Sequence, residues 1–350
     1  MPAPGQWVSG SLIGGDNIQI GAVAGSVVIM HDRPAYRLVV LTPGNQLPVV
    51  PDWQQQPSYL LDAQRQVVPF RPRSRDAELA TLTAWRDDSS ARVSLRLVHG
   101  PGGQGKTRLA SRFASHAHAA GWMVAQAVDK HPGLRGRLNH ELNLSSVSGM
   151  GLLVVVDYAE RWRLPVLVQL VGDLVVDDAD RQVRVLLLAR PGQRWWEDLR
   201  SELGRSCVEV AEPLELGPFA KPGVERIGAF DQAVEAFTQA LGAPAARIPP
   251  PRDVAHPDYG TPLVLHMAAL AAVCAHRDGE AVPGREELSA FLLEHERRGW
   301  ARVAASLAAD ARYGAISVDA LERTVLVATL FGPLRRDLSF VVFGGDGWLS

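Results

Sequence analysis

The chain has 350 residues, of which 47% are hydrophobic and 21% are charged, and its formal net charge is −2. This length and composition predict a soluble, cytoplasmic globular protein of two or three structural units, each with a buried core. The near-neutral charge gives no global reason to expect a nucleic-acid or membrane-surface partner. No apolar run approaches the roughly 20 residues that span a bilayer. Cys207 and Cys274 lie far apart, which indicates neither a disulfide framework nor a zinc site.

The first 31 residues differ in composition from the rest of the chain. Residues 1–31 carry a single charged side chain, Asp16, among many Gly, Ser, Val and Ile residues. Two short β-prone runs, Asn17–Ile20 and Ser26–Ile29, are separated by the turn-forming segment Gly21–Gly25. We expect a hairpin or stacked strands in this N-terminal segment.

A linker with some local structure is predicted for residues 32–72. A strand-like run, Leu38–Leu41, is followed there by prolines at 43, 48, 51 and 57. Repeated prolines interrupt regular structure, so we expect no long helix or strand in this segment.

Residues 73–217 read as an α/β domain in which strands and helices alternate. The predicted elements are a helix over Asp76–Trp85, a strand over Arg92–Val98, a helix over Lys106–Ala119, a strand over Trp122–Val128, a strand over Leu152–Val156, a helix over Leu164–Val176 and a strand over Val183–Leu188. Several of these strands are continuously apolar, as strands buried on both faces are. We therefore predict a parallel sheet with helices on both faces.

Residues 218–310 change character and predict an all-α domain. The apolar spacing indicates helices over Val224–Leu241, Thr261–His276 and Glu286–Ala308. A further helix is expected over Val318–Leu330, within a third region, 311–350, that ends without a recognisable closing element.

The most specific motif follows the first predicted strand of the α/β domain and opens its helix. It has the form Gly-x-x-x-x-Gly-Lys-Thr, and we expect Gly100, Pro101, Gly102, Gly103, Gln104, Gly105, Lys106 and Thr107 to bind a nucleotide, ATP or ADP with Mg²⁺. In such a P-loop, glycines let backbone N–H groups surround phosphate oxygens, while Lys106 reaches the phosphates and Thr107 ligates the metal. The alternative is an accidental Gly-rich turn.

Three further polar residues are candidates for the same site. Asp157 ends a continuously apolar strand and is expected to hold Mg²⁺; it could instead cap the next helix. Glu160 could orient or deprotonate a water, or be an exposed first-turn residue. Arg190 follows the next buried strand, where it could contact a γ-phosphate or form a surface ion pair. Tyr158 stands where fast ATPases with a P-loop often have a catalytic glutamate, so we expect slow hydrolysis of ATP.

These motifs, together with Gly260-Thr261-Pro262-Leu263 opening a helix, resemble those of the STAND NTPases, the signalling ATPases that include NB-ARC and NACHT proteins, and particularly their actinobacterial members. The resemblance covers about residues 65–330. It implies that Pro262 packs against adenine. It also implies that Arg73, in Phe70-Arg71-Pro72-Arg73, lies near the nucleotide; the alternative for Arg73 is a solvated linker residue.

The same resemblance implies a switch. Members of this family are closed with ADP and self-associate with ATP, and a winged-helix domain follows the helical domain. Residues 311–350 are therefore expected to be the truncated start of a winged-helix domain.

The N-terminal segment suggests how a signal leaves such a switch. Asn17-Ile18-Gln19-Ile20-Gly21 resembles the core of the RIP homotypic interaction motif and similar bacterial amyloid signalling motifs. Uncharged β-prone strands with a Gln ladder suit a cross-β zipper. The resemblance implies an effector protein with a matching motif, in bacterial defence or regulated cell death; the alternatives are a small hairpin and disorder.

Three functions follow from the sequence as hypotheses. The first is a signalling switch with slow ATP hydrolysis. The second is a conventional ATP-turnover enzyme, such as a small-molecule kinase or motor ATPase, for which no acceptor-substrate motif is visible. The third is an inactive scaffold stabilised by a nucleotide.

Overall fold

The computed structural model describes residues 35–41, 54–71, 74–129, 150–176, 181–204, 208–308, 317–319 and 322–323. The expectations for residues 1–31, Arg73 and nearly all of residues 311–350 fall outside these ranges.

Seven strands and eight α-helices make up the described part of the chain. The strands are β1 (Tyr36–Val40), β2 (Val93–His99), β3 (Met123–Asp129), β4 (Gly151–Val156), β5 (Gln182–Ala189), β6 (Glu209–Val210) and β7 (Leu214–Glu215). The helices are α1 (Pro57–Leu61), α2 (Asp76–Asp87), α3 (Lys106–Ala119), α4 (Leu164–Val176), α5 (Gln193–Leu203), α6 (Val224–Leu241), α7 (Pro262–Asp278) and α8 (Leu288–Ala308). Single 3₁₀ turns occur at Ala159–Arg161, Pro257–Gly260 and Arg285–Glu287.

All the strands belong to one sheet, in the order β1-β3-β4-β5-β2-β6, with β7 also paired to β2. β2, β3, β4 and β5 run parallel in the middle of the sheet. β5 lies between β2 and β4, and the register pairs His99 with Ala189 and Val156 with Leu187. The carboxyl ends of these three strands therefore meet at one edge, which is where ligands bind in open α/β sheets.

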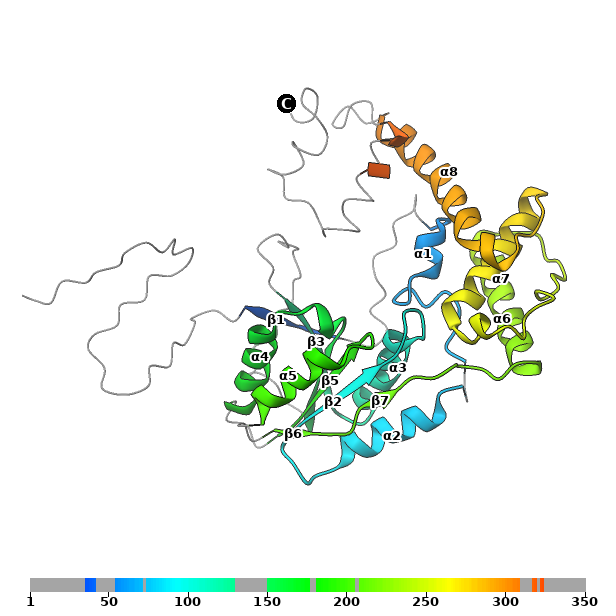
Figure 1. The fold of residues 1–350 in the computed structure, drawn as a ribbon. Helices are drawn as coiled ribbons and strands as arrows, with labels where there is room; N and C mark the ends of the chain where they lie inside the picture. The colour runs from blue at the N-terminus through cyan, green and yellow to red at the C-terminus, as the bar shows by residue number, and fades with distance from the viewer. Residues whose placement is uncertain are drawn as a thin grey trace, which may run out of the picture. The chain divides into compact units, whose positions relative to one another are not determined.

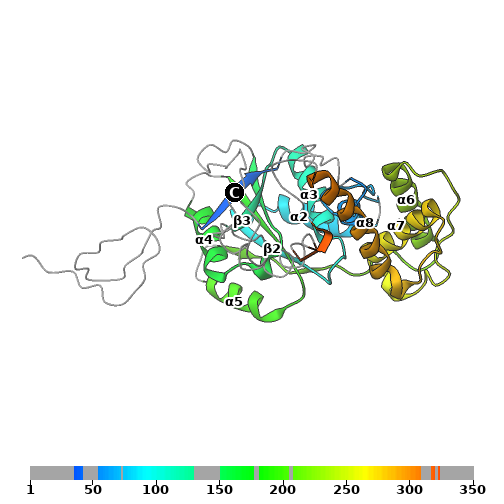
Figure 2. The same ribbon diagram turned by 90° about the horizontal axis from the view of Figure 1, so that it is seen from above.

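Helices cover both faces of the sheet, as Figures 1 and 2 show. On one face α4 and α5 pack over the strands, with Leu170 of α4 and Val154 of β4 in one core cluster. On the other face α2 and α3 do so, with Phe113 of α3 and Leu153 of β4 in a second cluster. Neighbouring residues of β4 thus point to opposite cores, which explains why the whole strand is apolar and buried.

The edge strand β1 departs from the predicted parallel sheet. Tyr36–Val40 pairs antiparallel with β3, so the sheet is mixed with mostly parallel strands. The sequence predicts a strand-like run at Leu38–Leu41 within a linker, because prolines follow it, and does not place that run in the sheet. Tyr36 and Leu38 are buried in the same core as α4, so burial of one face of the run holds it in the sheet.

The helical part has a core of its own, built from α6, α7 and α8. Phe230 and Phe237 of α6 and Leu270 of α7 are fully buried in it. Leu60 of α1 and Val68, both in the segment predicted as a linker, pack into the same core. The segment before α2 is therefore ordered against the helical part.

The predicted helices agree closely with the structure, whereas α1 and α5 were not predicted. α3, α4 and α6 have the predicted bounds, and α7 begins at Pro262, whose fixed φ suits a first helical position. The short β6 and β7, of two residues each, were not predicted. Among the described residues, no helix combines the length and the apolar character needed to cross a membrane.

Candidate functional site

The loop between β2 and α3 has a backbone that requires glycine at two positions. Gly103 and Gly105 have φ values of +78° and +84°, in the left-handed region that side chains rarely adopt. A Cβ on Gly103 would also come within 2.7 Å of the Leu263 Cβ. The Gly-rich run is therefore a constrained structural element.

The carbonyl groups in the first half of the loop accept hydrogen bonds from the lysine of the motif. Lys106 Nζ donates to the carbonyl of Gly100 at 2.6 Å and to that of Pro101 at 2.9 Å. Burial lowers the pKa of Lys106, while the nearby carboxylates of Glu160 and Asp157 act in the opposite direction. The ammonium group thus lies against the loop with acidic partners close by.

The carbonyl groups in the second half of the loop accept hydrogen bonds from residues outside the loop and α3. The Leu263 N–H donates to the Gly103 carbonyl at 3.3 Å, and Arg75 Nη2 donates to the Gln104 carbonyl at 3.2 Å. A loop whose carbonyls bond to protein donors can direct its N–H groups toward an anion, which is the arrangement of a phosphate nest.

The N-terminus of α3 adds to this arrangement. The first i to i−4 hydrogen bond of the helix runs from the Leu109 N–H to the Gly105 carbonyl. The N–H groups of Lys106, Thr107 and Arg108 precede that bond, so they have no i−4 acceptor within the helix. These groups and the positive end of the helix dipole favour an anion at this position.

Asp157 lies beside the loop at the end of β4. Its Oδ2 accepts a hydrogen bond from Thr107 Oγ1 at 3.0 Å, and its Oδ1 accepts one from the Tyr158 N–H at 2.9 Å. Burial raises the pKa of Asp157, and the hydrogen bonds from Thr107 and Tyr158 oppose that rise. A hydroxyl and a carboxylate in contact form the donor set that a hard divalent cation prefers.

The chain turns sharply after Asp157. Tyr158 has a φ of +52° and begins the 3₁₀ turn Ala159–Arg161. Its ring is half exposed and lies under the guanidinium of Arg161, 4.8 Å from the ring centroid. The turn that follows places Glu160 near Lys106.

Glu160 has both carboxylate oxygens buried, and neither has a hydrogen-bond partner among the described residues. A buried carboxylate without hydrogen bonds costs free energy and is rare in folded proteins. Its position suits a group that binds a water or a metal-bound ligand.

Arg190 follows β5, between the loop on β2 and Asp157 on β4. Its guanidinium lies beside Gly102, since a Cβ built there would be 3.9 Å from the Arg190 Cζ. The side chain is exposed, so it is free to meet an anion above the loop.

These groups surround one hollow of about 390 Å³, a volume that includes its open mouth. It is lined by Gly102, Gly103, Lys106, Thr107, Asp157, Tyr158, Glu160, Leu188, Ala189 and Arg190. The structure therefore brings together the four polar residues that the sequence selected as catalytic candidates.

The remaining candidates lie around the loop. Pro262, at the first turn of α7, is 3.8 Å from a Cβ built on Gly105. Gln104 is 7% exposed and its amide Oε1 has no partner among the described residues. Arg73 lies outside the described residues, so its predicted role stays a prediction.

Arg75 is a residue that the sequence interpretation missed. It is 5% exposed and contacts the loop directly through the Gln104 carbonyl. Arg71, Arg73 and Arg75 alternate along the chain, and nothing in that pattern indicates which of them reaches the loop. The one feature of the sequence that sets Arg75 apart is its position just before the predicted helix, α2.

The residues present fit a nucleotide phosphate with Mg²⁺. The loop offers constrained glycines and a lysine, Thr107 and Asp157 offer oxygen ligands, and Glu160 offers an unpaired carboxylate.

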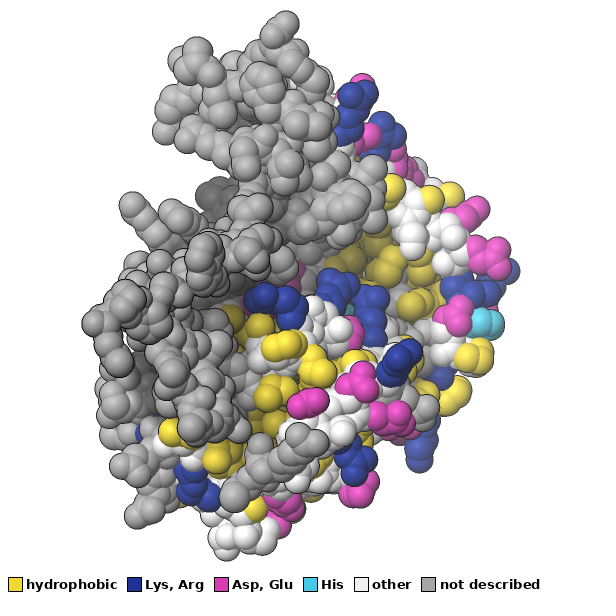
Figure 3. Space-filling view, turned by 60° about the vertical axis from the view of Figure 1, so that its left-hand side comes forward, with side chains coloured by type: hydrophobic (Ala, Val, Ile, Leu, Met, Phe, Trp, Pro, Cys, Tyr) yellow, Lys and Arg dark blue, Asp and Glu magenta, His cyan; other side chains and the backbone are white. Residues whose placement is uncertain are grey.

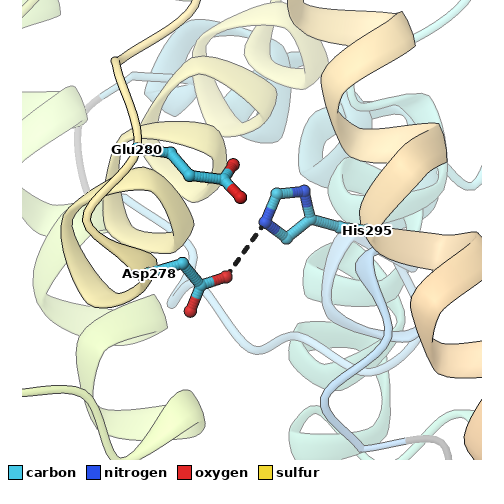
Figure 4. Close-up of side chains that lie close together, drawn as sticks. All are labelled: Asp278, Glu280 and His295. Atoms are coloured by element: carbon cyan, nitrogen blue, oxygen red, sulfur yellow. Dashed lines mark hydrogen bonds and ion pairs between the residues drawn. The ribbon is translucent and has the colours of Figure 1, made fainter.

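A second polar cluster, at the α7–α8 junction, consists of Asp278, Glu280 and His295 (Figure 4). His295 Nε2 lies 3.2 Å from Asp278 Oδ2, and its Nδ1 lies 3.0 Å from the Phe291 carbonyl. Arginines already neutralise both carboxylates: Arg277 bonds Asp278, and Arg298 bonds Glu280. We therefore interpret this cluster as an ion-pair network that joins two helices.

The described surface carries both signs of charge. On the face shown in Figure 3, basic and acidic side chains are interspersed with apolar ones over the described residues. This distribution agrees with the small net charge of the chain.

No protein-family model matches the chain, and a search of curated proteins found no match. Solved structures that match the chain include the ORC2 protein of Aeropyrum pernix in ADPNP–ADP complexes, at 14% identity over 79% of this chain and 88% of that chain, with a TM-score of 0.41. Others are the Thermotoga maritima RuvB Holliday junction branch migration motor, at 15% over 77% and 86% with a TM-score of 0.39, and Brucella abortus NtrX in complex with ADP, at 11% over 75% and 69% with a TM-score of 0.37. Likeness at this level does not identify a function.

Proposed function

We propose that this protein binds ATP or ADP with Mg²⁺ at the β2–α3 loop and hydrolyses ATP slowly, as a signalling switch. The observation that carries the proposal is the convergence of Lys106, Thr107, Asp157 and Glu160 on one hollow beside a loop whose carbonyls are held by protein donors. That combination of a nest, a cation and three oxygen groups is what phosphoryl transfer requires.

Each residue has a distinct role in this proposal. The loop N–H groups and Lys106 bind the β- and γ-phosphates, while Thr107 and Asp157 hold Mg²⁺ and its bound water. When bound, ATP with Mg²⁺ supplies the phosphoanhydride and the cation that neutralises it. Glu160 orients a water and accepts its proton, and Arg190 stabilises the negative charge that develops on the γ-phosphate.

Slow turnover is expected from the position of the acid. The residue directly after Asp157 is Tyr158, which offers no carboxylate to accept a proton from the attacking water. Glu160 reaches the hollow only through the left-handed turn at Tyr158. We infer a rate well below the roughly 10 per second of a typical enzyme.

The switch part of the proposal rests on contacts between the loop and the helical part. The Leu263 N–H of α7 bonds the loop at Gly103. A change in the loop on exchange of ADP for ATP therefore alters a contact of α7. We propose that this change permits self-association of the chain and passes a signal through residues 1–31 to an effector with a matching motif, in bacterial defence or regulated cell death.

The experiment is to purify the full chain without added nucleotide, identify any released nucleotide after denaturation, and measure ADP affinity and ATP turnover. Lys106→Ala is the test variant, and Lys221→Ala, which removes an exposed lysine elsewhere, is its matched control. We expect bound ADP and turnover below about 1 per second for the wild type and the control. Lys106→Ala should lose at least about a hundredfold in affinity, as when a buried charge-assisted contact is removed.

Other outcomes separate the alternative functions. Rapid turnover from an empty site, abolished in Lys106→Ala, would replace the switch by a conventional turnover enzyme. A wild type that neither binds nor hydrolyses nucleotide would contradict the proposal altogether.

A further inference from the structure

Arg75 is among the most buried charged side chains described in this chain. It is 5% exposed and stands just before the first residue of α2, and its Nη1 forms an ion pair with Glu78 Oε1 at 2.7 Å. Burying a guanidinium is costly unless each donor has a partner, so such an arginine holds its surroundings in one arrangement.

The other partners of Arg75 belong to two different segments. Its Nη2 donates to the Gln104 carbonyl of the loop at 3.2 Å and to the Gly217 carbonyl at 2.9 Å. Gly217 follows β7, on the connection that leads from the sheet to α6. One planar guanidinium therefore fixes the loop to the beginning of the helical part.

A second contact acts at the adjoining loop residue. The Leu263 N–H of α7 donates to the Gly103 carbonyl, and the Leu263 side chain leaves no room for a Cβ on Gly103. Gly103 and Gln104 are thus both held by groups outside the loop and α3. Lys106 holds only the earlier carbonyls, those of Gly100 and Pro101.

We propose that Arg75 is a positioning residue for the nucleotide site, which holds the second half of the loop in its phosphate-binding shape and makes that shape depend on docking of the connection at Gly217. Arg75 does not line the hollow. Its effect therefore passes through the Gln104 carbonyl to the loop N–H groups. The proposal rests on the proposed function for its effect on nucleotide affinity.

The test measures Mg²⁺–ADP affinity by calorimetry and the kinetics of ATP turnover on the full chain. Arg75→Ala should weaken ADP binding about tenfold or more, because a buried charged donor is lost from the loop. The KM for ATP should rise by a similar factor and kcat should change less than about threefold, as expected for lost binding rather than lost chemistry. Arg75→Lys keeps the charge beside Glu78 but not the planar fork, so it should recover only part of the affinity.

Arg71→Ala is the matched control. Arg71 lies on the same segment and donates to the Glu225 carbonyl of α6, without a bond to the loop. It should change ADP affinity less than about twofold even if it lowers the melting temperature as much as Arg75→Ala does. Equal loss of affinity in both variants, or wild-type affinity in Arg75→Ala, would overturn the proposal.

A second measurement does not depend on nucleotide binding. Amide hydrogen exchange of residues 100–107 in the nucleotide-free chain should speed up in Arg75→Ala and stay unchanged in Arg71→Ala. If the wild type binds no nucleotide, the proposed function fails, while this exchange result still decides whether Arg75 positions the loop.

Discussion

Arg184 at the amino end of the sheet and Glu160 at the carboxyl end are both buried charged groups, but they differ in their hydrogen bonds. At the amino end, Arg184 of β5 is 1% exposed, and it donates to main-chain carbonyls including those of Trp85 at 3.1 Å and Ala91 at 3.2 Å. At the carboxyl end, Glu160 is also buried at both oxygens, yet neither oxygen has a hydrogen-bond partner among the described residues, and the nearby charge of Lys106 acts on it only through space.

This difference indicates a structural role for Arg184 and a functional role for Glu160. A buried charge with a full set of hydrogen bonds stabilises the fold, whereas a buried charge without them destabilises it and persists where function requires it. The backbone adds to this contrast, because Tyr158, a non-glycine residue with a left-handed φ, lies at the carboxyl end. We therefore expect loss of the paired charge at the amino end to lower stability. Changes at the carboxyl end should affect binding or turnover, and removing a buried charge or backbone strain there should raise stability.

The largest expected effect is at the amino end. Arg184→Ala should lower the free energy of unfolding by about 3 kcal/mol, because it leaves several buried carbonyls without their charged donor. Urea unfolding measures this, with Arg200→Ala, an exposed arginine on α5, as a control expected within about 0.5 kcal/mol of wild type. A loss below about 1 kcal/mol in Arg184→Ala would show that the network is not structural.

Next in size is the effect on turnover at the carboxyl end. Glu160→Gln keeps the shape of the side chain but removes the proton acceptor, so kcat should fall about a hundredfold or more while ADP affinity changes less than about threefold. Steady-state ATP hydrolysis and calorimetry check this against Glu197→Gln, which changes an exposed acid on α5. Unchanged turnover in Glu160→Gln would assign the proton transfer to another group.

Much of the sheet could be predicted because its signals are local. The apolar run of β4 and the motif that opens α3 each carry their own pattern, and the predicted α3 has the observed bounds. β1 could not be assigned to the sheet in the same way. Its position depends on pairing with β3, far along the chain, and local composition around Tyr36–Val40 indicates only a strand in a proline-rich segment.

The site shows the same limit. The motif spacing selected Lys106, Thr107 and Asp157, and the structure brings these residues together. Sequence could not distinguish the alternatives for Glu160, because its direction is set by the left-handed turn at Tyr158. Arg75 was missed because contact with the loop depends on tertiary placement of the segment before α2.

A smaller effect concerns the buried acid of the site. Burial raises the pKa of Asp157 above its ordinary 3.8, so the folded chain holds that proton more tightly than the unfolded chain does. The associated stability is present below pH 3.8 and is lost as the pH rises through the raised folded-state pKa. Without metal or nucleotide, Asp157→Asn should therefore be more stable than wild type at pH 7, by roughly 1 kcal/mol.

The control for this prediction is pH itself. The advantage of Asp157→Asn should shrink as the pH falls from 7 through the folded-state pKa of Asp157, since protonation removes the buried charge, and adding Mg²⁺ should stabilise only the wild type. Thermal unfolding across this range measures both effects. An advantage that does not change with pH would mean that ionisation of Asp157 costs the fold nothing.

An effect of similar size tests the strained turn beside that acid. Alanine also has a Cβ, so Tyr158→Ala keeps the strain of the left-handed φ. It loses the contact with Arg161 as well, so it should destabilise the chain. Tyr158→Gly loses the same contact but adopts that φ freely. Glycine should therefore be more stable than alanine here by about 1 kcal/mol, the reverse of their usual order. Urea unfolding of the two variants compares them directly, and the usual order would show that the turn stores no strain, which would weaken the contrast between the two ends of the sheet.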